Sequence, residues 1–253
     1  MKIINLIAVL AFAMCFSSTL YCQSTAVLSD KKGQEIVDNA IQKHGGKKYE
    51  QLNMQFDFRE RTYKVVRNKG MFSYRRLFKD STGSPIIDIL TNIGFERLQN
   101  NQPVSLPEER KKAFTNSINS VIYFALLPYG LNDKAAVKKY LGEVTVKGQP
   151  YQKVKVTFQK EGGGKDFDDE FIYWFHRDKK TLDYLAYLFH VDGGGLRFRA
   201  AYNPRKVGGI LLLDYENYAP ISKEATLEIL DKLYENGELK MLSKIENIAI
   251  KYK

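Results

Sequence analysis

The sequence predicts a mainly β fold of the α+β class: a strongly curved antiparallel sheet, or half-barrel, of about nine to eleven strands with helices on its concave side. Three observations lead to this class. Apolar and polar residues alternate in about ten short segments, as they do in strands with one buried face. Glycine-rich turns join most of these segments too closely for crossover helices, which indicates antiparallel pairing. Helical spacing of apolar residues is confined mainly to one stretch near the N-terminus and one in the middle.

The first predicted element is a helix from Asp30 to His44. Aspartate is a common N-cap residue, the apolar residues from 36 to 41 follow three-to-four spacing, and Gly45 and Gly46 end the helix. His44 lies in the last turn, where a partial positive charge interacts favourably with the helix dipole.

Strands are predicted on both sides of a helical insertion at about residues 105–140. In the insertion, Pro107 opens a helix that ends before Pro128, and Asn132 or Asp133 caps a shorter helix that reaches Tyr140. The segment 226–234 has the composition of a short helix or a strand. The predicted strands are residues 54–58, 63–66, 71–78, 86–91, 95–99, 144–146, 154–158, 171–176, 184–190, 196–202, 209–214 and 239–252.

Residues 1–22 have the pattern of an export signal. Lys2 precedes an apolar run of about 14 residues, which is short for a membrane span but typical of a signal peptide. We expect a single mature domain at residues 23–253. Three outcomes are open: cleavage directly after Cys22, lipidation of Cys22 as the first residue of a lipoprotein, and retention of the segment as an anchor.

Composition and charge narrow the function. The two cysteines, Cys15 and Cys22, lie in the signal segment, so an internal disulfide and cysteine-based metal or redox chemistry are not expected. The net charge of +10 favours an anionic partner such as a membrane surface. We expect no nucleic-acid partner, because no recognition motif is present and the chain is predicted to be exported.

Several short motifs carry a resemblance to a known group. They are His44-Gly45-Gly46, Tyr173-Trp174-Phe175, and the run from Gly193 to Arg199 that continues to Tyr202-Asn203-Pro204-Arg205. With them the chain resembles an uncharacterised secreted family of Bacteroidota-type bacteria and the LolA and LppX type of periplasmic lipid carrier. That resemblance implies an incomplete barrel that holds acyl chains on its concave side beneath a helical lid.

The abundance of aromatic residues gives independent support for an apolar ligand. The chain has 16 Tyr and 15 Phe, many of them on predicted strands, and a curved sheet can leave such rings around a cavity. The alternative is a solid core, because aromatic residues also fill the interior of ordinary sheets. The candidate cavity residues are Phe56, Phe58, Tyr173, Phe175 and Phe198.

A polar constellation lies near the predicted turn at residues 192–195. Arg197 and Arg199 alternate with apolar residues, so they share one face of their strand, and His190 and Arg205 are near enough to join them. Such a group is suited to binding the anionic end of a ligand. Phe198 faces the other side, so the headgroup would sit at a rim near this turn. The alternative is a solvated strand face with cross-strand partners such as Asp183 or Asp214.

Three functions remain open at this stage: an exported envelope protein that binds a hydrophobic or lipid-like ligand, a non-catalytic envelope interaction or structural module, and an uncharacterised hydrolase. Enzymatic activity is not favoured, since no catalytic motif is present, and no cofactor is predicted. His44, His176 and His190 lack metal-ligand spacing, and the acidic residues at 166–170 lack the pattern of a calcium loop. The expected location is the periplasm or the outer membrane, with an envelope protein as a further possible partner.

Overall fold

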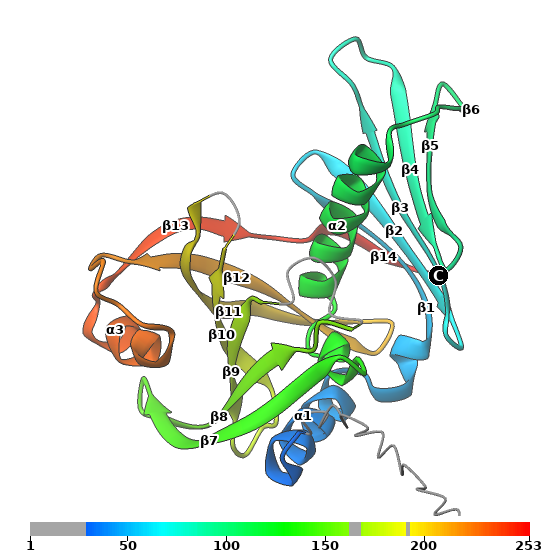
Figure 1. Ribbon diagram of the computed structural model, residues 1–253. Coiled ribbons are helices and arrows are strands. Elements are labelled where there is room, and N and C mark those ends of the chain that lie inside the picture. The colour runs from blue at the N-terminus through cyan, green and yellow to red at the C-terminus, as the bar shows by residue number, and fades with distance from the viewer. Residues whose placement is uncertain (1–28, 162–167, 191–192) are drawn as a thin grey trace, which may run out of the picture.

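The computed structural model describes residues 29–161, 168–190 and 193–253, and it confirms a mainly β, antiparallel fold. Within these residues the strands form two open sheets of seven strands each instead of one sheet of nine to eleven (Figure 1). The expected signal segment at residues 1–22, including Cys22, lies outside the described residues. The acidic residue Asp166 lies outside them as well.

The first sheet is the upper right part of Figure 1. Neighbouring strands are joined mostly by tight turns, and Lys69 and Gly70, for example, both have positive φ in the turn after β2. In spatial order its strands are β14 (Ile248–Tyr252), β1 (Gln51–Phe58), β2 (Arg61–Asn68), β3 (Met71–Lys79), β4 (Pro85–Thr91), β5 (Gly94–Gln99) and β6 (Gln102–Pro103).

The second sheet is also a meander, and it contains longer strands. In spatial order they are β13 (Leu239–Ile245), β12 (Ile210–Pro220), β11 (Gly195–Val207), β10 (Leu182–Phe189), β9 (Glu170–His176), β8 (Gln149–Phe158) and β7 (Ala136–Val146). The segment predicted as one final strand is divided, because β13 pairs with β12 whereas β14 returns to pair with β1. The C-terminal segment therefore ties the two sheets together.

In the described part of the chain three α-helices pack against the sheets, and two of them are as predicted. The first is α1 (Lys31–His44), capped by Asp30, whose side chain accepts a hydrogen bond of 2.5 Å from the amide of Gly33. The second is α2 (Glu108–Ala125), which lies over the inner face of the first sheet and points towards the second (Figure 1). The third is α3 (Leu230–Asn236), which lies beside the second sheet.

The shorter helix predicted up to Tyr140 is wrong. Asp133 accepts a hydrogen bond from the amide of Ala135 in a turn, and the chain then enters β7. Ten residue pairs join β7 to β8, beginning with Ala136 opposite Phe158. Pairing with a long neighbouring strand outweighs the weak local preference for a helix.

Buried apolar side chains form three clusters, one beside each helix. The α1 cluster fills the space between α1 and the inner face of the second sheet, and the α2 cluster lies between α2 and the first sheet. The α3 cluster occupies the opposite face of the second sheet. These clusters contain, respectively, Val37, Tyr173, Phe175 and Leu185; Met54, Phe56, Tyr63 and Ile122; and Trp174, Phe198, Ala186 and Leu230.

Candidate functional site

The candidate site is built around Arg199, a buried arginine on β11. Because side chains alternate along a strand, Arg199 faces the inner side of the second sheet, whereas Phe198 faces the α3 cluster. Its cross-strand neighbours are Leu185 on β10 and Asn217 on β12. Arg199 is only 9% exposed, so the solvated strand face considered from the sequence does not describe this residue.

The guanidinium group of Arg199 has few polar contacts for a buried cation. One terminal nitrogen donates a hydrogen bond of 2.9 Å to the hydroxyl of Tyr187. The guanidinium carbon lies 4.1 Å from the centroid of the Phe124 ring, a cation–π contact with α2. The Nε–H group is buried and has no hydrogen-bond partner in the described part of the chain. A buried donor of Arg199 is thus left unsatisfied, which is costly for the fold.

No carboxylate compensates this charge among residues 29–161, 168–190 and 193–253. By contrast, the buried cations Arg76 and Lys153 form ion pairs with Asp88 and Asp231. A buried cation without an ion-pair partner lowers the free energy of unfolding by several kcal/mol. Binding an anion beside it would recover a similar amount. Burial raises the pKa of the neighbouring Tyr215 hydroxyl, so this group stays neutral and supplies no negative charge.

A pocket of about 200 Å³ lies directly beside Arg199. It is formed where the C-terminal half of α2 meets both sheets, and its walls are largely apolar. Arg59, an exposed residue of the turn between β1 and β2, lies at its edge and adds a second positive charge. The side chains that line it are Phe58, Arg59, Ser120, Val121, Phe124, Ala125, Arg199, Tyr215, Ile245 and Asn247.

A larger cleft of about 1210 Å³ runs along another side of α2. Phe72 and Tyr74 of the first sheet and Ile122 and Leu126 of the helical segment give it an apolar wall. The guanidinium carbon of Arg67 lies 4.7 Å from the centroid of the Tyr129 ring in the same cleft. The two hollows are thus separated by α2, which contributes residues to both.

The other predicted anion-binding residues are not brought together with Arg199. Arg205 forms an ion pair with Asp214 at 2.9 Å and donates a hydrogen bond to the backbone carbonyl of Asn247. Arg197 donates a hydrogen bond to the carbonyl of Leu196 and lies over the Phe189 ring. His190 is exposed just beyond the end of β10.

The predicted cavity residues are distributed over all three clusters. Phe58 lines the pocket beside Arg199, and Phe56 lies in the α2 cluster. Tyr173 and Phe175 lie in the α1 cluster. Phe198 lies in the α3 cluster, on the far side of the second sheet from Arg199. Of the five residues, Phe58 is the one that the structure places at this pocket.

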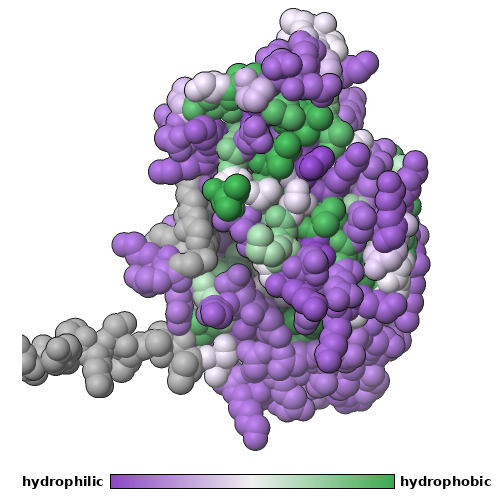
Figure 2. Space-filling view, turned by 90° about the vertical axis from the view of Figure 1, so that its right-hand side faces the viewer, coloured by the Kyte–Doolittle hydropathy of each residue, from purple (hydrophilic) through white to green (hydrophobic). Residues whose placement is uncertain are grey.

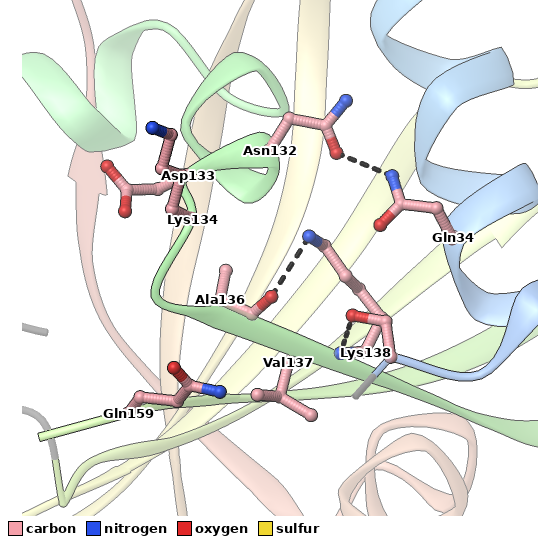
Figure 3. A pocket seen from close by; sticks show the side chains of 9 residues that line it. Gln34, Asn132, Asp133, Lys134, Ala136, Val137, Lys138 and Gln159 are labelled. Atoms are coloured by element: carbon pink, nitrogen blue, oxygen red, sulfur yellow. Dashed lines mark hydrogen bonds between the residues drawn. The ribbon is translucent and has the colours of Figure 1, made fainter. Parts of the chain in front are cut away.

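A third hollow, of about 340 Å³, is polar and lies where α1 meets β7 (Figure 3). Gln34 donates a hydrogen bond to the side chain of Asn132, and the ammonium group of Lys138 donates one to the carbonyl of Ala136. Burial lowers the pKa of Lys138. Since most of its polar groups bond to one another, this hollow is less suited to an apolar molecule than the pocket beside Arg199.

Sequence reasoning found Arg199 but missed the residues that make it a site. Phe124, Val121 and Tyr187 belong to segments that were predicted to be helical or extended, with nothing to show that they meet. The apolar stripe of α2 was the one available signal. No group of three or more His, Cys, Asp or Glu side chains arranged to hold a metal occurs in the described ranges. No helix in those ranges is long and apolar enough to cross a membrane.

The comparisons with known proteins give a family and a set of structural likenesses. The model of a family of unknown function, DUF6503, matches residues 10–247. No curated protein matches the chain. The family match agrees with the expected resemblance to an uncharacterised family.

Three solved structures illustrate the likeness in fold. A LolA superfamily protein from Nitrosomonas europaea is 10% identical, with a TM-score of 0.48 over 87% of this chain and 93% of that chain. A domain from Vibrio parahaemolyticus, described as a putative outer membrane lipoprotein-sorting protein, is 8% identical, with a TM-score of 0.46 over 88% and 92%. A DUF1329 family protein from Desulfovibrio piger is 12% identical, with a TM-score of 0.47 over 87% and 93%.

Proposed function

Because the chain belongs to DUF6503, a family of unknown function, its own geometry has to indicate what it does, and we propose that it is an exported cell-envelope protein that holds a hydrophobic, lipid-like molecule by an anionic end. The observation that carries this proposal is Arg199: a buried cation, without a carboxylate partner in the described residues, at the wall of an apolar pocket. Export rests on the signal pattern of residues 1–22.

The pocket beside Arg199 favours a ligand with a small anionic group attached to a hydrocarbon chain. A carboxylate would accept hydrogen bonds from the free Nε–H and a terminal nitrogen, in the paired geometry that guanidinium groups favour. Its first methylene groups would contact Phe58, Val121 and Ile245, so the charge and the apolar surface would be matched at once.

A pocket of about 200 Å³ holds only the end of a long-chain lipid. The larger cleft along α2 has the volume and the apolar wall for the remainder. Because α2 separates the two hollows, a ligand that fills both would have to pass beneath this helix, and α2 would have to move outward to admit and release it. Few of the α2 residues are fully buried, Ile118 and Ile122 being the two, which favours such movement.

The proposal is tested by what co-purifies with the full-length protein. Solvent extraction followed by mass spectrometry should yield an acidic lipid-like molecule from the wild type. The yield should be unchanged in Arg197→Met, a matched control on the same face of β11, and lost in Arg199→Met. Equal yields from the two variants would contradict a role for Arg199 in binding. If no molecule can be extracted from the wild type or either variant, the interaction-module alternative is favoured.

A further inference from the structure

A second cationic cluster lies on the inner face of the first sheet, away from Arg199. Two aromatic rings, Phe78 at the end of β3 and Phe114 on α2, form its centre. Three guanidinium groups lie over each ring, at 5.1–5.7 Å from the centroid of Phe78 and at 4.0–5.6 Å from that of Phe114. We call these four residues the guanidinium cluster: Arg61, Arg76, Arg97 and Arg110.

One carboxylate serves the guanidinium cluster. Asp88 is completely buried and binds both inner members, with oxygen to nitrogen distances of 2.6 Å to Arg76 and 2.6 Å to Arg97. The outer members, Arg61 and Arg110, form no ion pair within the described residues. A single negative charge thus faces four positive ones, and the cluster keeps a clear excess of positive charge.

The outer members are accessible to a partner. Arg61 begins β2 and is exposed, and Arg110 is exposed in the first turn of α2. Arg110 is followed by Lys111 and Lys112, so cations accumulate at the end of the helix where the helix dipole is itself positive. Glu108 offsets part of this charge by pairing with Lys111 at 2.6 Å, and Glu109 lies beside it.

The surroundings of the cluster favour a lipid surface over a dissolved ion. Figure 2 shows hydrophobic side chains among hydrophilic ones on the upper part of the molecule, which the first sheet occupies in Figure 1. Guanidinium groups bind phosphates through paired donors, and phenylalanine rings beside them offer apolar surface to the acyl chains below the headgroups. A net charge of +10 adds long-range attraction to an anionic bilayer.

We propose that the guanidinium cluster docks this protein on the phosphate headgroups of an anionic lipid surface, through Arg61 and Arg110. Arg76 and Arg97 are held in place by Asp88 and keep positive charge beside both aromatic rings. This contact would bring the end of the first sheet to a membrane without requiring the pocket beside Arg199 to be occupied.

The test is co-sedimentation of the full chain with vesicles of phosphatidylglycerol and with vesicles of phosphatidylcholine. The ratio of the two affinities is the readout, so that any insertion by the apolar N-terminal segment cancels. Arg61→Gln with Arg110→Gln should lower this ratio about thirty-fold, since each basic residue near such a surface contributes about a factor of five to ten. Neither side chain donates a hydrogen bond in the described residues, so folding should be preserved, which thermal melting checks.

The matched control is Lys206→Gln with Lys240→Gln, which removes two exposed charges from the second sheet. It should leave the ratio within about two-fold of the wild type, because these residues lie outside the cluster. If both double variants lower the affinity ratio equally, the effect depends on net charge alone, and the proposal is overturned. Competition by millimolar inorganic phosphate as strong as that by vesicles would overturn it too, because it would indicate a site for the free ion.

Discussion

The guanidinium carbon of Arg199 on β11 lies 4.1 Å from the centroid of the Phe124 ring on α2. This contact joins the second sheet to the helix that covers the first, and it covers the cation with an apolar ring in place of an anion. Cation–π contacts contribute about 0.5–2 kcal/mol, which is less than the cost of burying an unpaired arginine. The protein therefore keeps a group that lowers its own stability, as is common at binding sites.

Asp88 should be essential for the stability of the first sheet. Asp88→Asn removes the charge that compensates Arg76, which is only 3% exposed, and the free energy of unfolding should fall by about 3 kcal/mol. Urea denaturation measures this change. Asp57→Asn is the control, because the half-buried Asp57 accepts a hydrogen bond from Thr62 and has no ion pair in the described residues, so its loss should be about 1 kcal/mol or less. Similar losses in both variants would contradict a special role for Asp88.

His44 should make the protein less stable in mild acid. Burial lowers the pKa of His44 from 6.5 to about 4, and an interaction with the backbone of Leu211 only partly offsets this. Between these two values the unfolded state binds a proton that the folded state does not. The stabilising effect of the neutral ring is complete above pH 6.5 and is lost as the pH falls towards 4. The loss amounts to about 3 kcal/mol.

The comparison with His44→Gln isolates this effect. Glutamine does not titrate, and its side-chain oxygen can still accept the hydrogen bond that the amide of Leu182 donates to His44. Urea denaturation at pH 7.5 and pH 4.5 should therefore show a larger loss of stability in the wild type than in the variant. The burial of His44 also disfavours the partial positive charge that the sequence led us to expect at the end of α1. Equal losses would contradict the low pKa.

Trp174 reports whether a ligand enters the α3 cluster. It is the single tryptophan of the chain, it is fully buried, and its indole N–H donates a hydrogen bond of 3.0 Å to Asp231. Because Trp174 packs against Phe198 on the far face of the second sheet, its fluorescence should be unchanged when palmitate saturates the protein. A large shift in the emission of Trp174 would indicate that the ligand binds on the face of the second sheet that carries Phe198, which would contradict the proposed site.

The larger cleft should determine which chain lengths bind. Asn119 is an exposed residue of α2 that lines this cleft, and Asn119→Trp would fill part of it without disturbing the pocket beside Arg199. Palmitate should bind about ten-fold more weakly to this variant, since several methylene contacts are lost, whereas decanoate should bind as before. Asn119→Ala serves as the control. A parallel loss for both acids would contradict a ligand that extends into the cleft.

The strands were predictable because their alternation is local. Residues 54–58, for example, were predicted from their alternation and form the C-terminal part of β1 (Gln51–Phe58), and Asp30 caps α1 as expected. The division into two sheets was not predictable, because the long segment from β6 to β7 and the return of β14 to β1 depend on tertiary pairing. The helix predicted to end at Tyr140 failed for the same reason, since β8 decides the conformation of β7.

The candidate site was predictable only in part. The alternation around Arg199 placed it opposite Phe198, as the structure confirms. Its burial depends on Phe124, which belongs to another element far away in the sequence, so no local pattern could reveal it. Arg205 pairs with Asp214 on the neighbouring strand β12, a tertiary contact that the local pattern around Arg205 could not reveal.

The most direct test of the proposed function measures how well palmitate and hexadecanol each displace the fluorescent probe dansylundecanoic acid from the protein. The measurement is made on the wild type and on Arg199→Met. The wild type should bind palmitate about thirty-fold more tightly than hexadecanol, because a charge-assisted hydrogen bond to a buried arginine contributes about 2 kcal/mol. In Arg199→Met this preference should vanish while the free energy of unfolding rises by about 1–2 kcal/mol, since the unpaired cation is gone. A variant that still prefers palmitate as strongly as the wild type would contradict Arg199 as the anchor.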